Sequence, residues 1–161
     1  MVQQYLEKKP IFTPDYVGPY GVLLGMEFLE QDPAGGNVSR LPVTERILSR
    51  NRVLHGGAVF GIADTSMGLA FGATCEKGEI GVTNEIKICY FRPVPEGAGA
   101  LYAFSRVLHR GKRGGTVECE LKTPDGKLVG KAIGSFTLIR DPMLDSSGEP
   151  VYDYRKFRPQ E

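Results

Sequence analysis

The segment that decides the fold is "NRVLHGGAVFGIADTSMGLAFGATCEK", residues 51–77. Between Arg52 and Glu76 it carries one charged residue, Asp64. The apolar residues fall on nearly every side of a helix, which predicts a long helix over 56–76 that is buried all round. A carboxylate without a partner inside such a helix costs several kcal/mol, so Asp64 needs either a partner or a task.

The sequence on both sides of this helix has the alternation of β-strands. Ile86, Ile88 and Tyr90, for example, fall on one face of an extended segment, while Lys87 and Cys89 fall on the other. The predicted strands cover residues 21–30, 38–43, 83–94, 100–110, 115–122 and 127–140. Two strands, a buried helix and a four-stranded antiparallel meander predict an α+β domain whose single curved sheet wraps around the central helix.

The chain of 161 residues suits one domain, with 41% hydrophobic and 24% charged residues. We expect an irregular N-terminal arm over 1–20, the domain over 21–140 and a C-terminal tail over 141–161. A net charge of +1 gives no general attraction to nucleic acid or to an anionic membrane surface, so neither is an expected partner.

The cysteines indicate a reducing compartment. Cys75, Cys89 and Cys119 are odd in number and form no CxxC pair, so we expect three buried free thiols and neither a disulfide framework nor a metal site. The first ten residues lack the apolar run of a secretory signal, and Asp64 and the glycines interrupt the apolar helix. A cytoplasmic location is therefore expected.

The helix begins with His55, Gly56 and Gly57. Helix N-termini present unpaired N–H groups and a partial positive charge. Two glycines would let a carbonyl oxygen approach these groups, as in an oxyanion hole, or would merely allow a tight helix start. His55 could donate a hydrogen bond to a substrate or hold the loop by bonding to the backbone.

The stretch "HGGAVFGIADTSMG" (residues 55–68), with "RLPVTE" before it and "GVTNEIKICYFRPV" after it, resembles the HGG-x6-D motif of hotdog-fold acyl-CoA thioesterases of the PaaI-like (phenylacetyl-CoA or 4-hydroxybenzoyl-CoA thioesterase) group. The resemblance covers residues 21–140. It implies the hotdog fold and hydrolysis of an acyl-CoA, with coenzyme A as part of the substrate and no separate cofactor. Family members commonly have Asn and Gly where this chain has Ser49 and Arg52, and Asn51 is the nearest candidate to replace the Asn.

Asp64 would attack the thioester directly or activate a water molecule. Gly57 and Asp64 share a helix face but stand roughly 10 Å apart along the axis, too far to touch one carbonyl. An antiparallel second copy of the helix would bring them together, so we expect a homodimer with shared sites. The resemblance implies the same arrangement and a tetramer made of two dimers. Thr83 matches a position where relatives carry a Ser or Thr that orients the water or the carboxylate, although β propensity alone also explains a threonine there.

Coenzyme A carries phosphates, and basic side chains are candidates to bind them. Arg110, Lys112 and Arg113 lie on a glycine-rich turn, where relatives bind the nucleotide end, and Arg92 precedes Pro93. A solvated hairpin is the alternative for these charges.

Two other functions compete with the thioesterase. A hotdog (de)hydratase would need a His with an acidic partner, and a non-catalytic acyl-CoA-binding regulator would keep the pocket without needing Asp64. The acyl group is not readable from the sequence.

Overall fold

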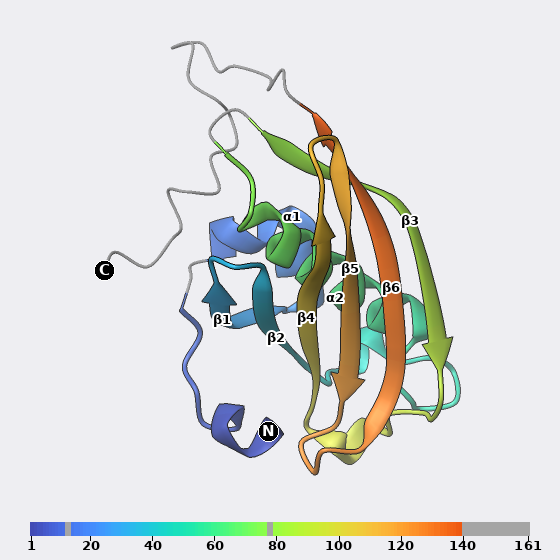
Figure 1. Cartoon of the computed structure of the whole chain (residues 1–161). Helices are drawn as coiled ribbons and strands as arrows, with labels where there is room; N and C mark the ends of the chain where they lie inside the picture. The colour runs from blue at the N-terminus through green and yellow to red at the C-terminus, as the bar shows by residue number, and fades with distance from the viewer. Residues whose placement is uncertain (12–13, 77–78, 140–161) are drawn as a thin grey trace.

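The computed structural model describes residues 1–11, 14–76 and 79–139, so the predicted tail lies outside the described residues. One six-stranded antiparallel sheet and two α-helices make up the described part of the chain, together with short turns (Figure 1). The strands are β1 (Glu27–Asp32), β2 (Gly36–Pro42), β3 (Ile80–Tyr90), β4 (Ala100–Arg110), β5 (Gly114–Lys122) and β6 (Leu128–Ile139). The α-helices are α1 (Pro14–Leu24) and α2 (Gly56–Gly72), and short 3-10 turns cover Val2–Tyr5, Glu45–Ile47 and Glu96–Ala98.

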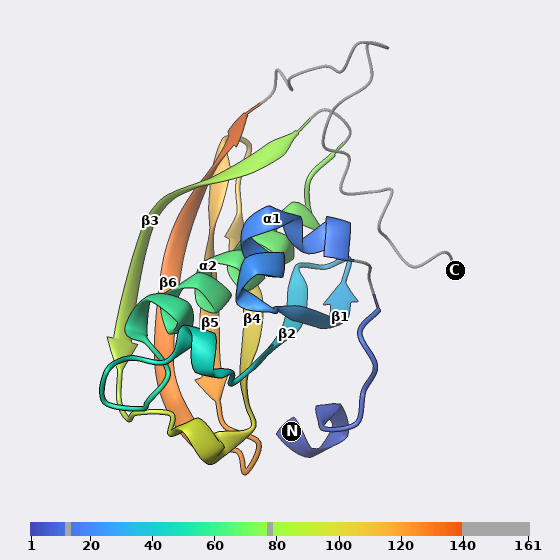
Figure 2. The same cartoon turned by 180° about the vertical axis from the view of Figure 1, so that it is seen from behind.

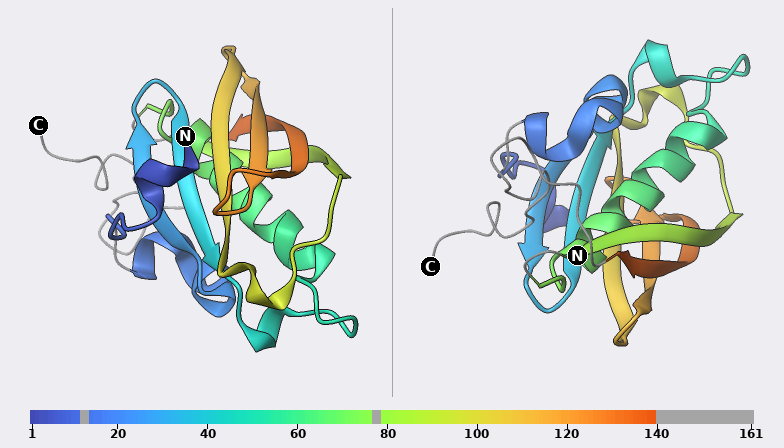
Figure 3. Two further views of the ribbon diagram at one scale, coloured as in Figure 1. Left: turned by 90° about the horizontal axis from the view of Figure 1, so that it is seen from below. Right: turned by 90° about the horizontal axis from the view of Figure 1, so that it is seen from above.

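The predicted α+β fold is confirmed, because the sheet curves around α2 as the central helix (Figure 3). The strand order is β1-β2-β4-β5-β6-β3. The predicted four-stranded meander is therefore wrong in one respect: β4, β5 and β6 form a meander, but β3 pairs with β6 and not with β4. Strand β3 thus lies at one edge of the sheet and β1 at the other.

A second correction concerns residues 21–24, which are helical and not the start of a strand. The run Gly-Val-Leu-Leu is short and apolar, and such a run fits a strand or a helix equally well. Helix α1 is kinked at Gly18 (φ 67°) and is followed by Gly25 (φ 75°). The helix runs across the predicted boundary at residue 20.

The core lies between α2 and the concave face of the sheet. Phe71 anchors the C-terminal half of α2 by stacking on Phe136 of β6, with ring centroids 5.3 Å apart. Gly115 makes room for this ring, since a Cβ there would lie 2.7 Å from Phe71 Cε2. Helix α2 ends at Gly72, four residues earlier than predicted.

A buried polar cluster joins α2 to the sheet. The hydroxyl groups of Ser66 on α2 and Ser39 on β2 donate to Asn37 Oδ1 at 2.8 and 2.7 Å. Ser105 on β4 donates to Ser66 Oγ at 2.8 Å. These four side chains are all buried, and their hydrogen bonds offset the cost of placing them in an apolar core.

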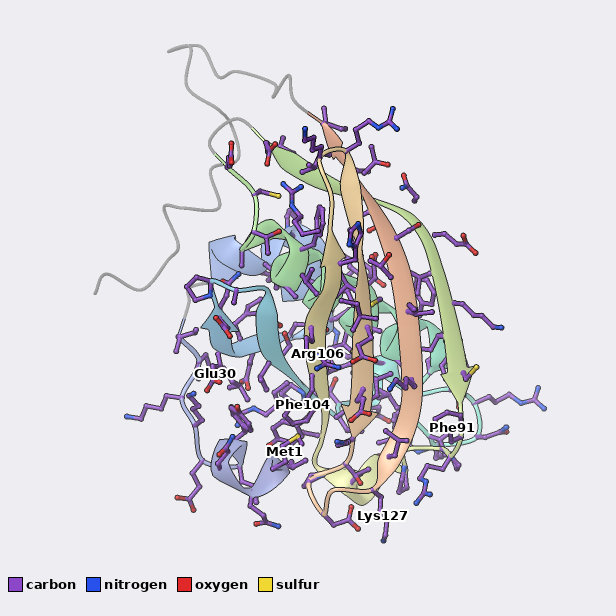
Figure 4. All side chains as sticks on the ribbon, in the orientation of Figure 1. Met1, Glu30, Phe91, Phe104, Arg106 and Lys127 are labelled. Atoms are coloured by element: carbon purple, nitrogen blue, oxygen red, sulfur yellow. The ribbon has the colours of Figure 1, made fainter. Side chains whose placement is uncertain are left out.

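The N-terminal arm packs on the convex face of the sheet (Figure 4). Tyr5 is buried there and donates its hydroxyl to Glu30 of β1 at 3.1 Å. Farther along, the N–H of Ile11 donates to the carbonyl of Phe28 at 2.8 Å. The arm therefore lies along the β1 edge of the sheet before the chain continues into α1, on the other side.

Candidate active site

The start of α2 is capped by the side chain that precedes it. The N–H of Gly57 donates to His55 Nδ1 at 2.9 Å, and the N–H groups of Ala58 and Val59 donate to the His55 carbonyl. Because Nδ1 accepts, the proton of the neutral ring lies on Nε2. The N–H of Gly56 has no hydrogen-bond partner among the described residues. Gly56, rather than Gly57, thus presents the open donor at the helix N-terminus.

Tyr90, at the end of β3, fixes the same helix start from the other side. Its hydroxyl donates to the carbonyl of Gly56 at 3.1 Å. Burial raises the pKa of Tyr90, so the phenol keeps its proton and remains a donor. The peptide group between Gly56 and Gly57 is therefore held at its carbonyl by Tyr90 and at its N–H by His55.

Helix α2 is not buried all round as predicted. Gly56 and Gly57 are exposed, and Phe60, Asp64 and Gly68 are half-buried. Positions 57, 60, 64 and 68 follow one another at helical spacing, so they form a single open stripe along α2. We call these residues the open stripe.

Asp64 lies in the open stripe and has a partner. Thr83 on β3 donates its hydroxyl to Asp64 Oδ1 at 2.9 Å. Strict alternation along β3 would place Thr83 on the opposite face from Ile86, facing away from α2. The β3–β6 register shifts between Thr83 and Glu85, and this bulge turns Thr83 toward the helix. The structure thus brings Asp64 and Thr83 together.

One chain does not bring Asp64 to the helix start. Eight residues separate Gly56 from Asp64 on the same helix, which amounts to roughly 12 Å along the axis. The free N–H of Gly56 and the carboxylate of Asp64 therefore cannot touch the same carbonyl group within a single chain.

The loop before α2 holds one non-glycine residue in a left-handed conformation. Arg52 has a φ of 59°, a conformation that glycine adopts most readily, as the glycine that the resemblance implies at this position would do. Its guanidinium pairs with Glu45 and Glu96, and the hydrogen bonds to these carboxylates raise the pKa of Arg52. Asn51 is exposed, whereas Ser49 Oγ is buried and has no hydrogen-bond partner within the described part of the chain.

Arg110 does not lie free on the surface turn where the sequence places it. Its guanidinium forms an ion pair with the buried Glu79 at 2.8 Å and donates to Thr74 Oγ1 at 3.2 Å. These contacts place Arg110 at the C-terminal end of α2, away from Gly56. Lys112 and Arg113 are exposed on the turn itself.

Arg92 lies near the start of α2. It lines a pocket of about 380 Å³ with Thr123, Asp125 and Lys127. Pro93 and Pro95 also line this pocket. The carbonyl of Val94, between them, accepts a hydrogen bond from the N–H of Leu54 at 2.8 Å, and Leu54 lies two residues before α2, so the pocket adjoins the helix start. Figure 4 shows Lys127 at this end of the sheet. Sequence reasoning missed Lys127, which belongs to the tight "TPDGK" turn and gives no signal of its own.

The cysteines behave differently from one another. Cys75 and Cys119 are buried, and burial raises the pKa of these thiols to about 11 and about 12. Cys89 is exposed, so the prediction that it is buried is wrong: it lies on the solvent face of β3.

Across residues 1–11, 14–76 and 79–139 no three His, Cys, Asp or Glu side chains gather as a metal site. No described helix is both long enough and apolar enough to cross a bilayer.

Comparison with known proteins points to one family. Residues 51–130 match the model of the thioesterase superfamily. The acyl-coenzyme A thioesterase PaaI of Escherichia coli is 32% identical over 107 residues, which are 66% of this chain and 72% of that protein. A conserved protein of Pseudomonas aeruginosa has a solved structure that aligns with a TM-score of 0.70 at 36% identity, over 76% of this chain and 94% of that one.

The fold comparison agrees with the sequence comparison. The structure of the Escherichia coli PaaI protein, from the phenylacetic acid degradation operon, aligns with a TM-score of 0.67 and 29% identity. It covers 74% of this chain and 83% of that one. The chain belongs to the PaaI-like group of hotdog-fold thioesterases.

Proposed function

We propose that this protein hydrolyses an acyl-CoA thioester to a free acid and coenzyme A. The observation that carries the proposal is the hydrogen-bonded pair of Asp64 and Thr83 in the open stripe of a helix that begins with the free N–H of Gly56. A carboxylate held by a hydroxyl and an unpaired helix N–H are the two groups that thioester hydrolysis needs.

The N–H of Gly56 and the helix dipole polarise the thioester carbonyl and stabilise the negative charge that develops on its oxygen. Asp64 then acts in one of two ways. As a base, it takes a proton from water while the water oxygen bonds to the carbonyl carbon; the carbon–sulfur bond then breaks and the proton passes to the coenzyme A sulfur. As a nucleophile, it forms a mixed anhydride, expels the thiolate and is released by water.

Both routes need Gly56 and Asp64 at one carbonyl, so we propose a homodimer in which each site takes Gly56 from one chain and Asp64 from the other. Two features support this: the open stripe of α2, and strand β3, which pairs with β6 on one side only in the sheet that the structure describes. Pairing two copies of β3 would set the two α2 helices side by side. A tetramer of two such dimers and a cytoplasmic location stay predictions.

Coenzyme A would extend from the helix start toward the pocket lined by Arg92 and Lys127. Both side chains are exposed and their positive charges suit phosphate groups, although Lys127 also pairs with Asp125 at 2.7 Å and would have to exchange this exposed partner for a phosphate. Lys112 and Arg113 lie at the opposite end of α2 in the same chain, so they would reach this coenzyme A only from the other subunit. The ion pair of Arg110 with Glu79 favours a structural role for Arg110.

The first experiment compares the wild type with Asp64→Asn and Gly56→Pro on a panel of acyl-CoAs. We expect Asp64→Asn to lower kcat by about 10³-fold or more, because the amide is neither base nor nucleophile. Gly56→Pro removes the single N–H donor and should cost about 10²–10³-fold in kcat. Proline fits the first helical position, and His55 before it already has the extended ψ of 136° that proline requires.

Coenzyme A release should be followed by chromatography, because a thiol-reactive dye would also label the exposed Cys89. Full activity of Asp64→Asn would contradict the mechanism. Binding of acyl-CoA without turnover by the wild type would favour the acyl-CoA-binding regulator. Product formation by addition or loss of water across a carbon–carbon bond would favour the (de)hydratase.

A further inference from the structure

Helix α1 lies against the face of α2 that turns away from the sheet (Figure 2). The contact is close at Gly61, where a Cβ would lie 2.8 Å from Tyr20 Oη and 2.9 Å from Leu24 Cδ1. Gly61 is buried by this contact although its neighbours in the open stripe are not. The absence of a side chain at Gly61 therefore lets Tyr20 approach the backbone of α2.

The position of Gly61 places Tyr20 beside the proposed chemistry. Gly61 lies roughly 6 Å from Gly57 and roughly 4.5 Å from Asp64 along the helix axis. Each residue turns the helix by about 100°, which puts Gly61 and Gly56 on opposite flanks of the open stripe. Tyr90 of β3 contacts Gly56, and Tyr20 of α1 contacts Gly61. The stripe is thus bounded by β3 on one flank and by α1 on the other.

The α1 flank presents large apolar groups to solvent. Tyr20 is 54% exposed and Leu23 is 61% exposed. The Tyr20 hydroxyl has no hydrogen-bond partner in the described part of the chain, and half-buried Phe60 precedes Gly61 on α2. Large exposed apolar side chains beside a candidate site indicate a surface for an apolar group.

We propose that Tyr20 and Leu23 of α1 form the wall that contacts the acyl group and favours bulky apolar acyl groups over acetyl. This inference rests on the proposed function, since the thioester carbonyl must lie at the open stripe for its acyl group to reach α1. It adds a specificity-determining element from a segment that the sequence assigns partly to an arm outside the domain.

The test measures kcat/KM for acetyl-CoA, hexanoyl-CoA and benzoyl-CoA with Tyr20→Ala, Leu23→Ala and Tyr20→Phe. We expect Tyr20→Ala to lower the ratio of bulky-acyl to acetyl kcat/KM by about tenfold, because a ring that packs on the acyl group is lost. Tyr20→Phe should keep the ratio, since the ring and not the hydroxyl forms the wall. Val22→Ala is the matched control: Val22 is exposed on the same helix, two residues from Tyr20 and so on its opposite side.

Gly61→Ala tests the wall from α2. Alanine favours the helix, so the variant should fold. Its methyl group would lie 2.8 Å from the Tyr20 hydroxyl and 2.9 Å from Leu24 Cδ1, so it must displace the ends of both side chains. As a single substitution, Gly61→Ala should change the ratio of bulky-acyl to acetyl kcat/KM. Added to Tyr20→Ala, it should have no further effect on that ratio.

A binding measurement separates this inference from the proposed function. The affinities of S-hexyl-CoA, a non-hydrolysable thioether, and of free coenzyme A are compared by calorimetry for the same variants. If the wild type hydrolyses no acyl-CoA, the proposed function fails, and the affinity ratio still decides the role of Tyr20. Three results would overturn the inference. Tyr20→Ala could lower kcat/KM equally for every acyl-CoA, or it could dissociate the dimer. The wild type could also bind S-hexyl-CoA no more tightly than free coenzyme A.

Discussion

At the scale of single residues, the position of Thr83 depends on one extra residue in β3. The bulge between Thr83 and Glu85 turns the hydroxyl toward α2, where it holds one oxygen of the Asp64 carboxylate. The other oxygen, Oδ2, accepts no hydrogen bond from the part of the chain that the structure describes. A threonine on this edge strand therefore sets the orientation of the group that we propose as base or nucleophile.

Thr83→Val should lower kcat by about tenfold, since a hydrogen bond to a charged group contributes about 1.5–3 kcal/mol and this one is exposed. Valine keeps the shape and the β propensity of threonine, so the strand should remain intact. Steady-state kinetics of Thr83→Val and of Thr83→Ser, which retains the hydroxyl, would check this. Equal activity of the valine variant and the wild type would assign Thr83 a purely structural role.

The residue-level site is partly readable from the sequence. The lone Asp64 and the His-Gly-Gly start are visible because the surrounding helix has no other charge. That His55 caps Gly57 and leaves Gly56 as the donor depends on one rotamer, which no pattern encodes. The ion pair of Arg110 with Glu79 joins residues 31 positions apart, so spacing could not predict it.

At the scale of elements, the buried polar cluster of Asn37, Ser39, Ser66 and Ser105 fixes how α2 is rotated on the sheet. Apolar contacts tolerate small rotations of a helix, whereas hydrogen bonds are directional and do not. Ser66 lies two residues after Asp64 and so on the opposite side of α2. The hydrogen bonds that hold Ser66 against the sheet therefore turn Asp64 away from the sheet, which keeps it in the open stripe.

Ser66→Ala should lower the free energy of unfolding by about 1–3 kcal/mol, because Ser105 loses its buried acceptor. Thr65→Ala is the matched control on the same helix; Thr65 is half-buried, and its change should stay within about 0.5 kcal/mol. Urea unfolding of both variants measures the difference. Equal stability of the two would show that the cluster does not hold the helix.

Strand positions are predictable where polar and apolar residues alternate, as in β5 and β6, whereas β3 begins three residues earlier and ends four residues earlier than the predicted 83–94. Alternation says nothing about which strand lies next to which. The pairing of β3 with β6 is set by how the chain passes around α2, and so it depends on the tertiary structure. The apolar run before Met26 lacks alternation altogether, and its helix forms because Tyr20 and Leu24 pack against Gly61.

At the scale of the whole molecule, the proposed sharing of sites has a direct test. In a mixed dimer of Asp64→Asn and Gly56→Pro chains, one shared site carries both substitutions and the other carries neither. Such dimers, isolated with two different affinity tags after co-expression, should recover about half of the wild-type activity. Either variant alone, purified the same way, is the control. If each site lies within one chain, the mixed dimer stays as inactive as its parents.

The arm at the β1 edge also governs how far such molecules can associate. A sheet with two open edges can recruit further strands at both, and fibres grow in this way. Here the backbone of Ile11 already bonds to Phe28 on β1, and Tyr5 and Lys8 hold Glu30 beside it. In the proposed dimer a second chain adds along β3 and then presents its own blocked edge outward. The arm therefore acts as a terminator of strand-by-strand polymerisation.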